Sequence, residues 1–274
     1  MVKSKTKSQI LTRRTSNNGR GFIRKIVRFI FYICIFAAVA VMLSVAGGYY
    51  YLSKNLHRIS SLKDYQPSVI TTVYSDDNRK IAEFYKERRI VLPMSKIPKM
   101  MFDAFVAAED ARFFKHKGID FFSIVRAFIK NIKAGTITQG GSTITQQVIK
   151  SFLLTPERSY TRKIKEAILA YRIDNIFTKE EVLFLYLNQI PLGHGAYGVE
   201  AASENYFGKS AKDLSLAECA ALADLPQAPS RYSPFKYPER AKQRQIYVLN
   251  RMIAEGYITN IQATEAINEV LDIK

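Results

Sequence analysis

The chain has 274 residues, a formal net charge of +17 and 47% apolar side chains. This length allows one large domain or two small ones, with enough apolar side chains for a sizeable core. The two cysteines, Cys34 and Cys219, exclude a cysteine-based metal spacing, and we expect no disulfide because Cys34 lies in a long apolar segment far from Cys219.

The first 28 residues carry nine Lys or Arg side chains and no acidic one, which leaves +8 on the rest of the chain. Such a net charge suits a nucleic acid, an anionic membrane surface or a phosphorylated substrate. The polar tail is expected to be disordered. An apolar segment follows it directly, so we attribute its charge to membrane topology and expect no nucleic-acid partner.

Residues 29–53 contain no charged side chain and are long enough for a transmembrane helix, which needs about 20 apolar residues. The preceding basic residues predict a cytoplasmic N-terminus, and Tyr49, Tyr50 and Tyr51 form an aromatic belt at the other end. Ser44 and Ala46 resemble the cleavage site of a signal peptide, which is the alternative. The length of the apolar run and the tyrosines favour an anchor.

After the anchor, the sequence predicts a mainly α-helical domain with one small β element. Residues 54–70 form a connector, and turn-prone residues 76–78 between β-prone runs predict a hairpin over 71–85. Apolar side chains recur at helical spacing from Pro98 to Glu109. Further helices are predicted at 121–134, 143–154, 160–177, from Thr178 (a capping box with Glu181), from Ser215 (with Glu218), at 238–255 and at 259–271.

The first segment with chemical character surrounds Glu109. This residue lies seven positions after Phe102 and four after Phe105, so a helix places its carboxylate on the apolar face. Burial raises the pKa of a carboxylate and favours a role in proton transfer. The alternative is a glutamate that reaches solvent or pairs with Arg112, and the residues taken alone favour this alternative.

Two further segments could bind anions. Gly140 and Gly141 precede hydroxyl side chains at the start of a helix, where free backbone N–H groups suit a phosphate; an ordinary capped loop explains this equally well. The segment lacks the Lys-Ser/Thr ending of a nucleotide P-loop. Lys150 and the cations of 158–165 precede Glu166 and form either a diphosphate cradle or a surface ladder of ion pairs. The spacing alone favours the ladder.

A fourth segment, residues 186–200, contains Gly193, Gly195 and Gly198. Glycines at this density indicate a tightly folded loop where another group approaches the backbone closely. His194 lies between them and could be a ligand or a base, although a single loop histidine is more often structural.

Together, and in this order, the segments resemble the peptidoglycan glycosyltransferase domain of class A penicillin-binding proteins and monofunctional transglycosylases. The resemblance runs from about Thr71 to Pro234. The matching runs are Glu109-Asp110-x-x-Phe113-x-x-His116-x-Gly118, Gly140-Gly141-Ser142-Thr143-Ile144-Thr145-Gln146-Gln147, Arg162-Lys163-x-x-Glu166, Tyr186-Leu187-Asn188 with Gly195-Ala196-Tyr197-Gly198, and Leu225-Pro226-Gln227-Ala228-Pro229-Ser230.

The resemblance implies a mainly α, lysozyme-like fold with two lobes and a cleft. It also implies polymerisation of lipid II, a disaccharide-pentapeptide on undecaprenyl diphosphate, into β-1,4-linked strands. By the family pattern Glu109 is the catalytic base, Glu166 is the second essential carboxylate, and Lys150 and Arg158 hold the donor diphosphate. The other positions assigned to substrate binding are Asp110, Ser142, Thr143, Gln146, Gln147, Arg162, Lys163 and Asn188.

The expected organisation is a basic cytoplasmic tail (1–28), a transmembrane helix (29–53), a connector (54–70), the glycosyltransferase domain (71–237) and a helical extension (238–274) that resembles the class A linker. The domain would face the periplasm on the bacterial cytoplasmic membrane. Its expected partners are lipid II, the growing strand, the bilayer and other cell-wall synthesis proteins. No cofactor is required by the pattern, although Mg²⁺ or another divalent cation supports some family members, with Glu166 as the candidate ligand.

Two positions depart from the family pattern. Pro191-Leu192 stands where an aromatic pair is common, and Asp224 stands where a glycine often precedes Leu-Pro. We expect neither departure to touch the charge chemistry.

Other functions compete with strand synthesis. Ser-x-x-Lys occurs at Ser4 and Ser60 without a domain around it, and Lys-Thr-Gly is absent, so no transpeptidase is expected in this chain. A lysozyme-like hydrolase or lytic transglycosylase also uses a carboxylate in a helical cleft. A non-enzymatic envelope scaffold is the third reading. The cations between Lys150 and Lys165 favour synthesis, because a cleaving enzyme has no diphosphate to hold.

Overall fold

The computed structural model describes residues 18–54, 70–85, 87–136, 140–152 and 159–274. The chain divides into an N-terminal unit, residues 1–55, and an outer domain, residues 56–274. Helix α1 (Asn18–Lys54) makes up the described part of the first unit. Its segment Arg24–Tyr51 is long and apolar enough to cross a membrane. The predicted span lies almost wholly inside this segment, and the helix begins within the basic tail.

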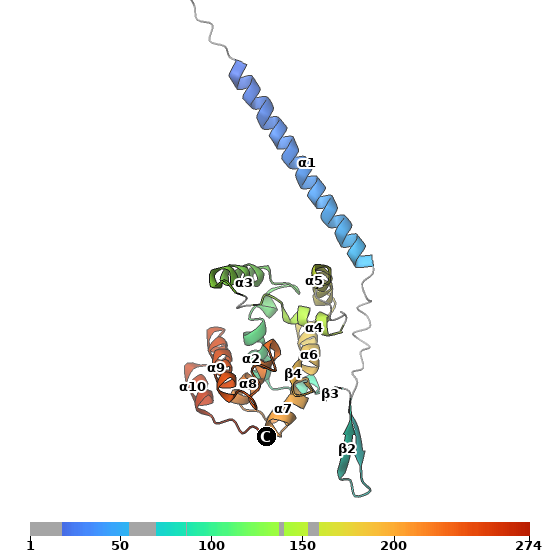
Figure 1. Cartoon of the computed structure of the whole chain (residues 1–274), viewed down its shortest axis with the longest axis vertical. Coiled ribbons are helices and arrows are strands. Elements are labelled where there is room, and N and C mark those ends of the chain that lie inside the picture. Colours follow the sequence, from blue (N-terminus) through green and yellow to red (C-terminus); the bar gives the residue numbers. More distant parts are fainter. Residues whose placement is uncertain (1–17, 55–69, 86, 137–139, 153–158) are drawn as a thin grey trace, which may run out of the picture. The chain divides into compact units, whose positions relative to one another are not determined.

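The predicted hairpin is present and projects from the helical part of the outer domain (Figure 1). Strand β1 (Thr71–Tyr74) pairs antiparallel with β2 (Lys80–Phe84), with Thr71 opposite Phe84 and a bulge at Val73/Tyr74. Asn78 in the turn takes a positive φ of 61°, which asparagine tolerates better than most residues.

A second small sheet was not predicted. Strand β5 (Ala196–Tyr197) lies between β3 (Arg88–Arg89), its parallel neighbour, and β4 (Pro191–Gly193), its antiparallel one. The tight loop predicted here is confirmed, because the backbone φ is positive from Gly193 to Gly195 and again at Gly198. A Cβ at Gly198 would lie 2.7 Å from the Asn188 carbonyl oxygen, so only glycine fits.

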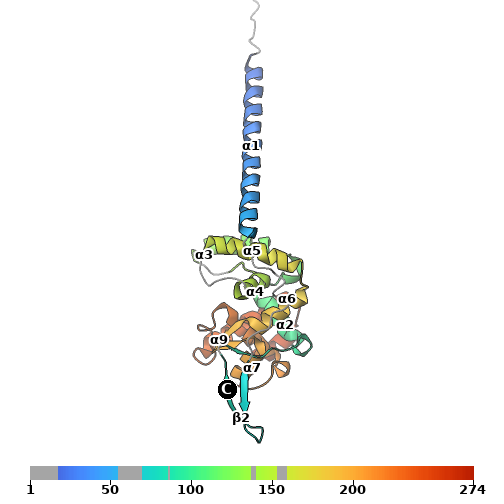
Figure 2. The same ribbon diagram turned by 90° about the vertical axis from the view of Figure 1, so that its right-hand side faces the viewer.

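Helices build the rest of the outer domain, as predicted (Figures 1 and 2). Helix α2 packs against α8 and α9, α10 packs on α9, and α4 packs against α5 and α6. Helices α3 and α5 lie at the same end of the domain in both views. The bounds are α2 Lys99–Glu109, α3 Phe121–Ala134, α4 Ile144–Phe152, α5 Tyr160–Asp174, α6 Lys179–Gln189, α7 Val199–Phe207, α8 Leu216–Ala223, α9 Pro238–Ala254 and α10 Asn260–Asn268, with short 3₁₀ turns η2 Met94–Lys96, η3 Phe113–Lys115, η4 Ala211–Asp213 and η5 Leu225–Gln227.

The helix ends follow the local signals in the sequence. Both predicted capping boxes are present, at Thr178 with Glu181 and at Ser215 with Glu218. Gly135 ends α3 in the left-handed conformation. Two helices are shorter than predicted: α5 ends at Asp174, where the next backbone N–H groups turn back to earlier carbonyls, and α10 ends at Asn268. Helix α7 was not predicted, and residues 153–154 of the predicted third helix lie outside the described residues.

Gly118 connects three parts of the domain. Its backbone φ is +75°, and a Cβ there would lie 2.3 Å from the Ala170 carbonyl oxygen on α5. Its own carbonyl oxygen accepts a hydrogen bond of 2.6 Å from the Thr143 hydroxyl, immediately before α4. The absence of a side chain at Gly118 therefore lets the segment after η3 approach α5, while the Gly118 carbonyl group binds the residue before α4.

We predict that Gly118→Ala lowers the free energy of unfolding by at least about 3 kcal/mol, the combined effect of a left-handed alanine and a backbone clash. Gly256→Ala is the matched control, since Gly256 has φ +76° but open space around it. It should cost about 1 kcal/mol. Denaturant unfolding of both variants measures the difference, and equal losses would show that the contact with α5 does not demand the glycine.

Candidate active site

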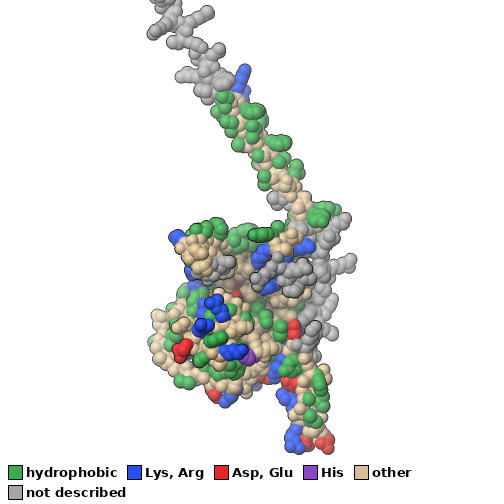
Figure 3. Space-filling model, viewed as in Figure 1, with side chains coloured by type: hydrophobic (Ala, Val, Ile, Leu, Met, Phe, Trp, Pro, Cys, Tyr) green, Lys and Arg blue, Asp and Glu red, His purple; other side chains and the backbone are tan. Residues whose placement is uncertain are grey.

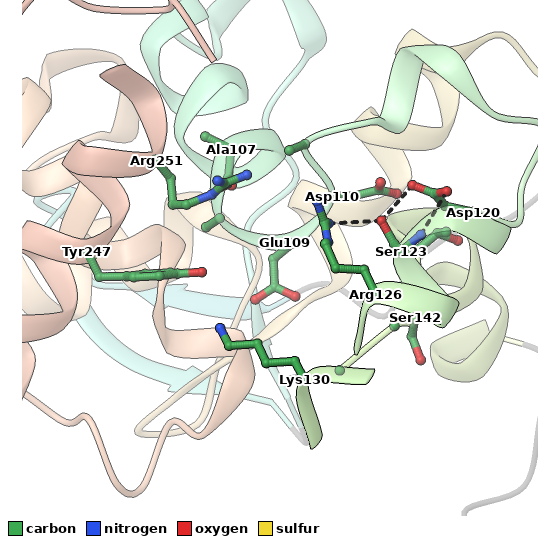
Figure 4. A pocket seen from close by; sticks show the side chains of 15 residues that line it. Ala107, Glu109, Asp110, Asp120, Ser123, Arg126, Lys130, Ser142, Tyr247 and Arg251 are labelled. Carbon is green, nitrogen blue, oxygen red and sulfur yellow. Dashed lines mark hydrogen bonds between the residues drawn. The ribbon is translucent and has the colours of Figure 1, made fainter. Parts of the chain in front are cut away.

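Glu109 is the last residue of α2 and lines two adjoining cavities of about 320 and 290 Å³. Both cavities are bounded by the C-terminal end of α2, by α3, by the loop before α4 and by α9. Figure 4 shows the carboxylate of Glu109 with Lys130 and Tyr247 around the larger cavity. The residues shared by the two cavities are Ala108, Glu109, Lys130, Gly140, Ser142 and Tyr247.

The environment of Glu109 alters its proton affinity. Burial is the largest effect and raises the pKa of Glu109 to about 7, while a hydrogen bond from Gln147 opposes the rise. Gln147 donates from Nε2 to Glu109 Oε2 at 2.7 Å, and its own Oε1 lies 3.5 Å from the hydroxyl of buried Tyr186. A carboxylate with this pKa exchanges a proton readily near neutral pH.

Asp110 lies beside Glu109 but uses its carboxylate differently. Its Oδ2 accepts a hydrogen bond of 3.0 Å from the Ile144 backbone N–H at the start of α4, and His116 Nε2 donates to both oxygens at 3.0 Å. Asp110 also lines the larger cavity. The carboxylate of Asp110 therefore joins α2 to α4. These hydrogen bonds occupy oxygens that the sequence assigned to substrate binding.

The glycine-hydroxyl loop caps α4. Thr143 donates its backbone N–H to Gln146 Oε1 at 3.0 Å, and Gln146 donates its own backbone N–H to the Thr143 hydroxyl at 3.2 Å. Gln146 is held in this reciprocal cap and lines neither cavity, whereas Ser142 lines both and Thr143 lines the larger one. Of the four residues predicted to line the cleft in this segment, Gln147 alone contacts Glu109 in the described structure.

The predicted cationic cluster gathers around Glu166, which is buried on α5. Lys163 pairs with one carboxylate oxygen of Glu166, and Arg162 lies 3.5 Å from the other. Lys163 Nζ also donates to the Ser142 hydroxyl at 2.8 Å and so connects this cluster to the rim of the cavities. Lys150 is exposed near the end of α4, one turn beyond Gln147, and Arg158 lies outside the described residues.

Asn188 does not join these residues. Its side chain is buried, where it accepts from the Leu92 backbone N–H at 2.8 Å and donates to the carbonyl oxygens of Leu92 and Phe184 at 3.2 and 3.1 Å. These bonds fix the segment after β3 against α6. The geometry gives Asn188 a structural role away from the two cavities.

Several cavity residues were not predicted. Arg126 and Lys130 line the larger cavity from α3, and Tyr247 and Arg251 line it from α9. The two residues of each pair lie four positions apart, so the sequence spacing alone indicates that they share a helix face. Helix α9 lies beyond the domain boundary expected at 237, yet it packs against α2 and α8 and forms a wall of both cavities.

The expectation that Asp224 would not touch the charge chemistry is wrong. Asp224 lines the smaller cavity together with Glu109, and its negative charge adds to the rise in the pKa of Glu109. Arg244 on α9 donates from Nε to both Asp224 oxygens at 2.8 Å. Asp224 therefore contributes a buried carboxylate, paired with half-buried Arg244, to the site.

The outer face of α3 is apolar and exposed. Phe121 and Phe122 are 71% and 73% exposed. Figure 3 shows hydrophobic side chains at the outer edge of the domain where α3 lies. Ser123, Arg126 and Lys130 of the same helix line the larger cavity. The other exposed apolar side chains of this face are Ile124, Val125, Phe128, Ile129 and Ile132.

A protein-held metal does not fit the described residues. No group of three or more His, Cys, Asp or Glu side chains in the described part of the chain could hold a metal ion. Glu166, the candidate ligand, is already paired with Lys163 and Arg162.

Comparison with known proteins places this geometry in a family. Residues 77–253 match the family described as Transglycosylase. The chain is 51% identical over 221 residues to penicillin-binding protein 1A of Aquifex aeolicus, covering 81% of this chain and 30% of the relative. It is 48% identical over 216 residues to the protein of the same name from Neisseria flavescens (79% and 27%) and 42% identical over 248 residues to that from Pseudomonas aeruginosa (90% and 30%).

Among solved structures, the crystal structure of penicillin-binding protein 1A from Haemophilus influenzae matches with a TM-score of 0.46 and 27% identity, over 77% of this chain and 22% of that one. The chain thus spans less than a third of the length of the relatives it matches. The family match itself covers both cavities, the Glu166 cluster and most of α9. The chain belongs to the transglycosylase family.

Proposed function

We propose that the chain is a peptidoglycan glycosyltransferase that polymerises lipid II into β-1,4-linked glycan strands during cell-wall biogenesis. The observation that carries the proposal is Glu109, whose half-buried carboxylate faces two cavities and has a pKa of about 7. At neutral pH a large share of such a carboxylate is ionised and able to accept the proton of a sugar hydroxyl.

In the proposed step, the 4-hydroxyl oxygen of the acceptor attacks C1 of the donor sugar and its proton passes to Glu109. The C1–O bond to the diphosphate breaks, and the bonding electrons leave with undecaprenyl diphosphate. Because this leaving group departs as an anion, cations stabilise the transition state more than a general acid would. Lys150, Arg162 and Lys163 are the described cations proposed for this role.

The cation cluster also favours synthesis over cleavage. A hydrolase or lytic enzyme releases a neutral sugar, and its carboxylate must donate a proton to the leaving oxygen. A diphosphate needs no such proton. We assign Glu166 to orient Lys163 and Arg162, with which it is paired, and we propose that any divalent cation would arrive with the diphosphate.

The substrate carries a long lipid, so the enzyme must work at a membrane. Helix α1 contains a candidate span, and the exposed apolar face of α3 suits contact with lipid. Anchoring confines enzyme and substrate to one surface and raises their effective concentration. We propose a cytoplasmic N-terminus, consistent with the basic residues before the span, and a catalytic domain on the outer face of the cytoplasmic membrane.

We predict that Glu109→Gln lowers the rate of lipid II polymerisation at least about 1000-fold, because the amide cannot accept the proton. For the wild type, activity should rise with pH as Glu109 loses its proton, and it should fall about tenfold per pH unit below pH 7. Purified protein with fluorescent lipid II, followed by separation of the glycan products, measures both effects.

Two outcomes would refute this assignment. An active Glu109→Gln variant would show that Glu109 is not the base. A wild type that shortens preformed strands without extending lipid II would identify a cleaving enzyme.

We further predict that Lys150→Ala lowers kcat/KM for lipid II about 100-fold, because one cation facing the departing diphosphate is lost. Lys212→Ala is the matched control, since Lys212 is an exposed lysine like Lys150 but lies on η4, outside helices α4 and α5 that carry the proposed cations. Steady-state kinetics of the two variants compares them. Equal kinetics would exclude Lys150 from the diphosphate site.

A further inference from the structure

An ion pair between buried Asp224 and half-buried Arg244 forms part of the wall beside Glu109. Asp224, at the C-terminal end of α8, is 3% exposed, and Arg244 on α9 donates to both of its oxygens at 2.8 Å. A second Arg244 nitrogen, Nη2, lies 2.5 Å from Asp224 and donates to Gln227 Oε1 at 2.5 Å. Asp224, Arg244 and Gln227 line the smaller cavity together with Glu109.

Two tyrosine rings also hold the guanidinium of Arg244. Its central carbon lies 5.0 Å from the ring centre of Tyr232 and 4.5 Å from that of Tyr247. Cation–ring contacts of this kind add to the bidentate ion pair. Asp224 therefore binds the N–H edge of the guanidinium, and the tyrosine rings pack against its plane. Since Tyr247 lines both cavities, the position of Arg244 also fixes a surface that faces Glu109.

The charges of the pair act on Glu109 in opposite directions. Asp224 raises the pKa of Glu109 and Arg244 lowers it. The pair therefore places two charges beside the carboxylate that act against each other. The other titratable or hydrogen-bonding groups that face Glu109 are Asp110 beside it, Gln147 on α4, Tyr186 on α6, Arg126 and Lys130 on α3, and Tyr247 and Arg251 on α9.

We infer that Asp224 and Arg244 are positioning residues for Glu109, which fix Tyr247 and Gln227 in the cavity wall while presenting a balanced charge to the base. The inference rests on the proposed function, because it assigns the pair to the reaction of Glu109. Neither residue transfers a proton or binds the diphosphate in this role.

Breaking the pair from either side should move the titration of Glu109 in opposite directions. Asp224→Asn leaves the positive charge of Arg244 facing Glu109 and lowers the pKa of Glu109. Arg244→Gln leaves the carboxylate of Asp224 unpaired and raises the pKa of Glu109. A charge that faces a carboxyl group across a small cavity changes the pKa of that group by about one pH unit. The double variant removes both charges and should titrate close to the wild type.

The test is ¹³C NMR of the full chain in detergent, with the side-chain carboxyl carbon of glutamate labelled and the Glu109 signal assigned by its loss in Glu109→Gln. This readout does not depend on activity. Arg240→Gln is the matched control, because Arg240 lies on the same helix over the Tyr237 ring and lines neither cavity. It should leave the titration of Glu109 unchanged.

Polymerisation of lipid II by the same proteins is measured as a function of pH. In each single variant, the acid limb of the pH–rate profile should shift by the same amount and in the same direction as the pKa of Glu109 measured by NMR. Titrations that stay fixed, or that move together in both single variants, would overturn the inference. A wild type that titrates as expected but makes no strands would instead overturn the proposed function.

An uncompensated buried charge can unfold a variant. If a single variant fails to fold, Arg244→Lys and the double variant carry the test. Both should keep the wild-type titration of Glu109, because neither leaves Asp224 charged and unpaired, and both should lose at least about tenfold in kcat as Tyr247 and Gln227 lose their support. Unchanged kcat in both would overturn the positioning role.

Discussion

The carboxylate of Asp110 joins the segments that surround the proposed base. It accepts hydrogen bonds from the first residue of α4 and from His116, and it is almost fully buried. A negative charge at a helix N-terminus is favourable, and its loss would leave a buried N–H group without a partner. Because Glu109 is the preceding residue, this contact also fixes the register in which Glu109 meets Gln147.

The two neighbouring carboxylates illustrate how environment separates their roles. Asp110 receives hydrogen bonds from a helix end and a histidine, whereas Glu109 receives one from a neutral amide. Burial dominates at Glu109 and raises its pKa, and the charges of Asp224 and Asp110 add to the rise. A base needs this combination, because burial with few donors gives a carboxylate an affinity for a proton near neutral pH.

Local signals in the sequence predicted the helices well, including both capping boxes and the end of α3 at Gly135. They did not predict the sheet in which β3 pairs with β5, because two-residue strands more than 100 positions apart leave no periodic pattern. The walls of the site were missed for a similar reason. Spacing shows which side chains share a helix face, but only the packing of α9 on α2 shows that Arg244 and Tyr247 face Glu109.

The cations near the site divide into two classes with different consequences for substrate binding. The Nε and Nη2 donors of Arg244 are taken by Asp224 and Gln227, and the carboxylate of Asp224 balances its charge, so the pair offers an incoming anion no net positive charge. Lys163 is half-exposed, and Ser142 and Glu166 take two of the three donors of its ammonium group. Among the described residues, one donor of Lys163 therefore remains for an anion at little desolvation cost. This difference favours the α5 cluster, and not the ion pair on α9, as the partner of a diphosphate.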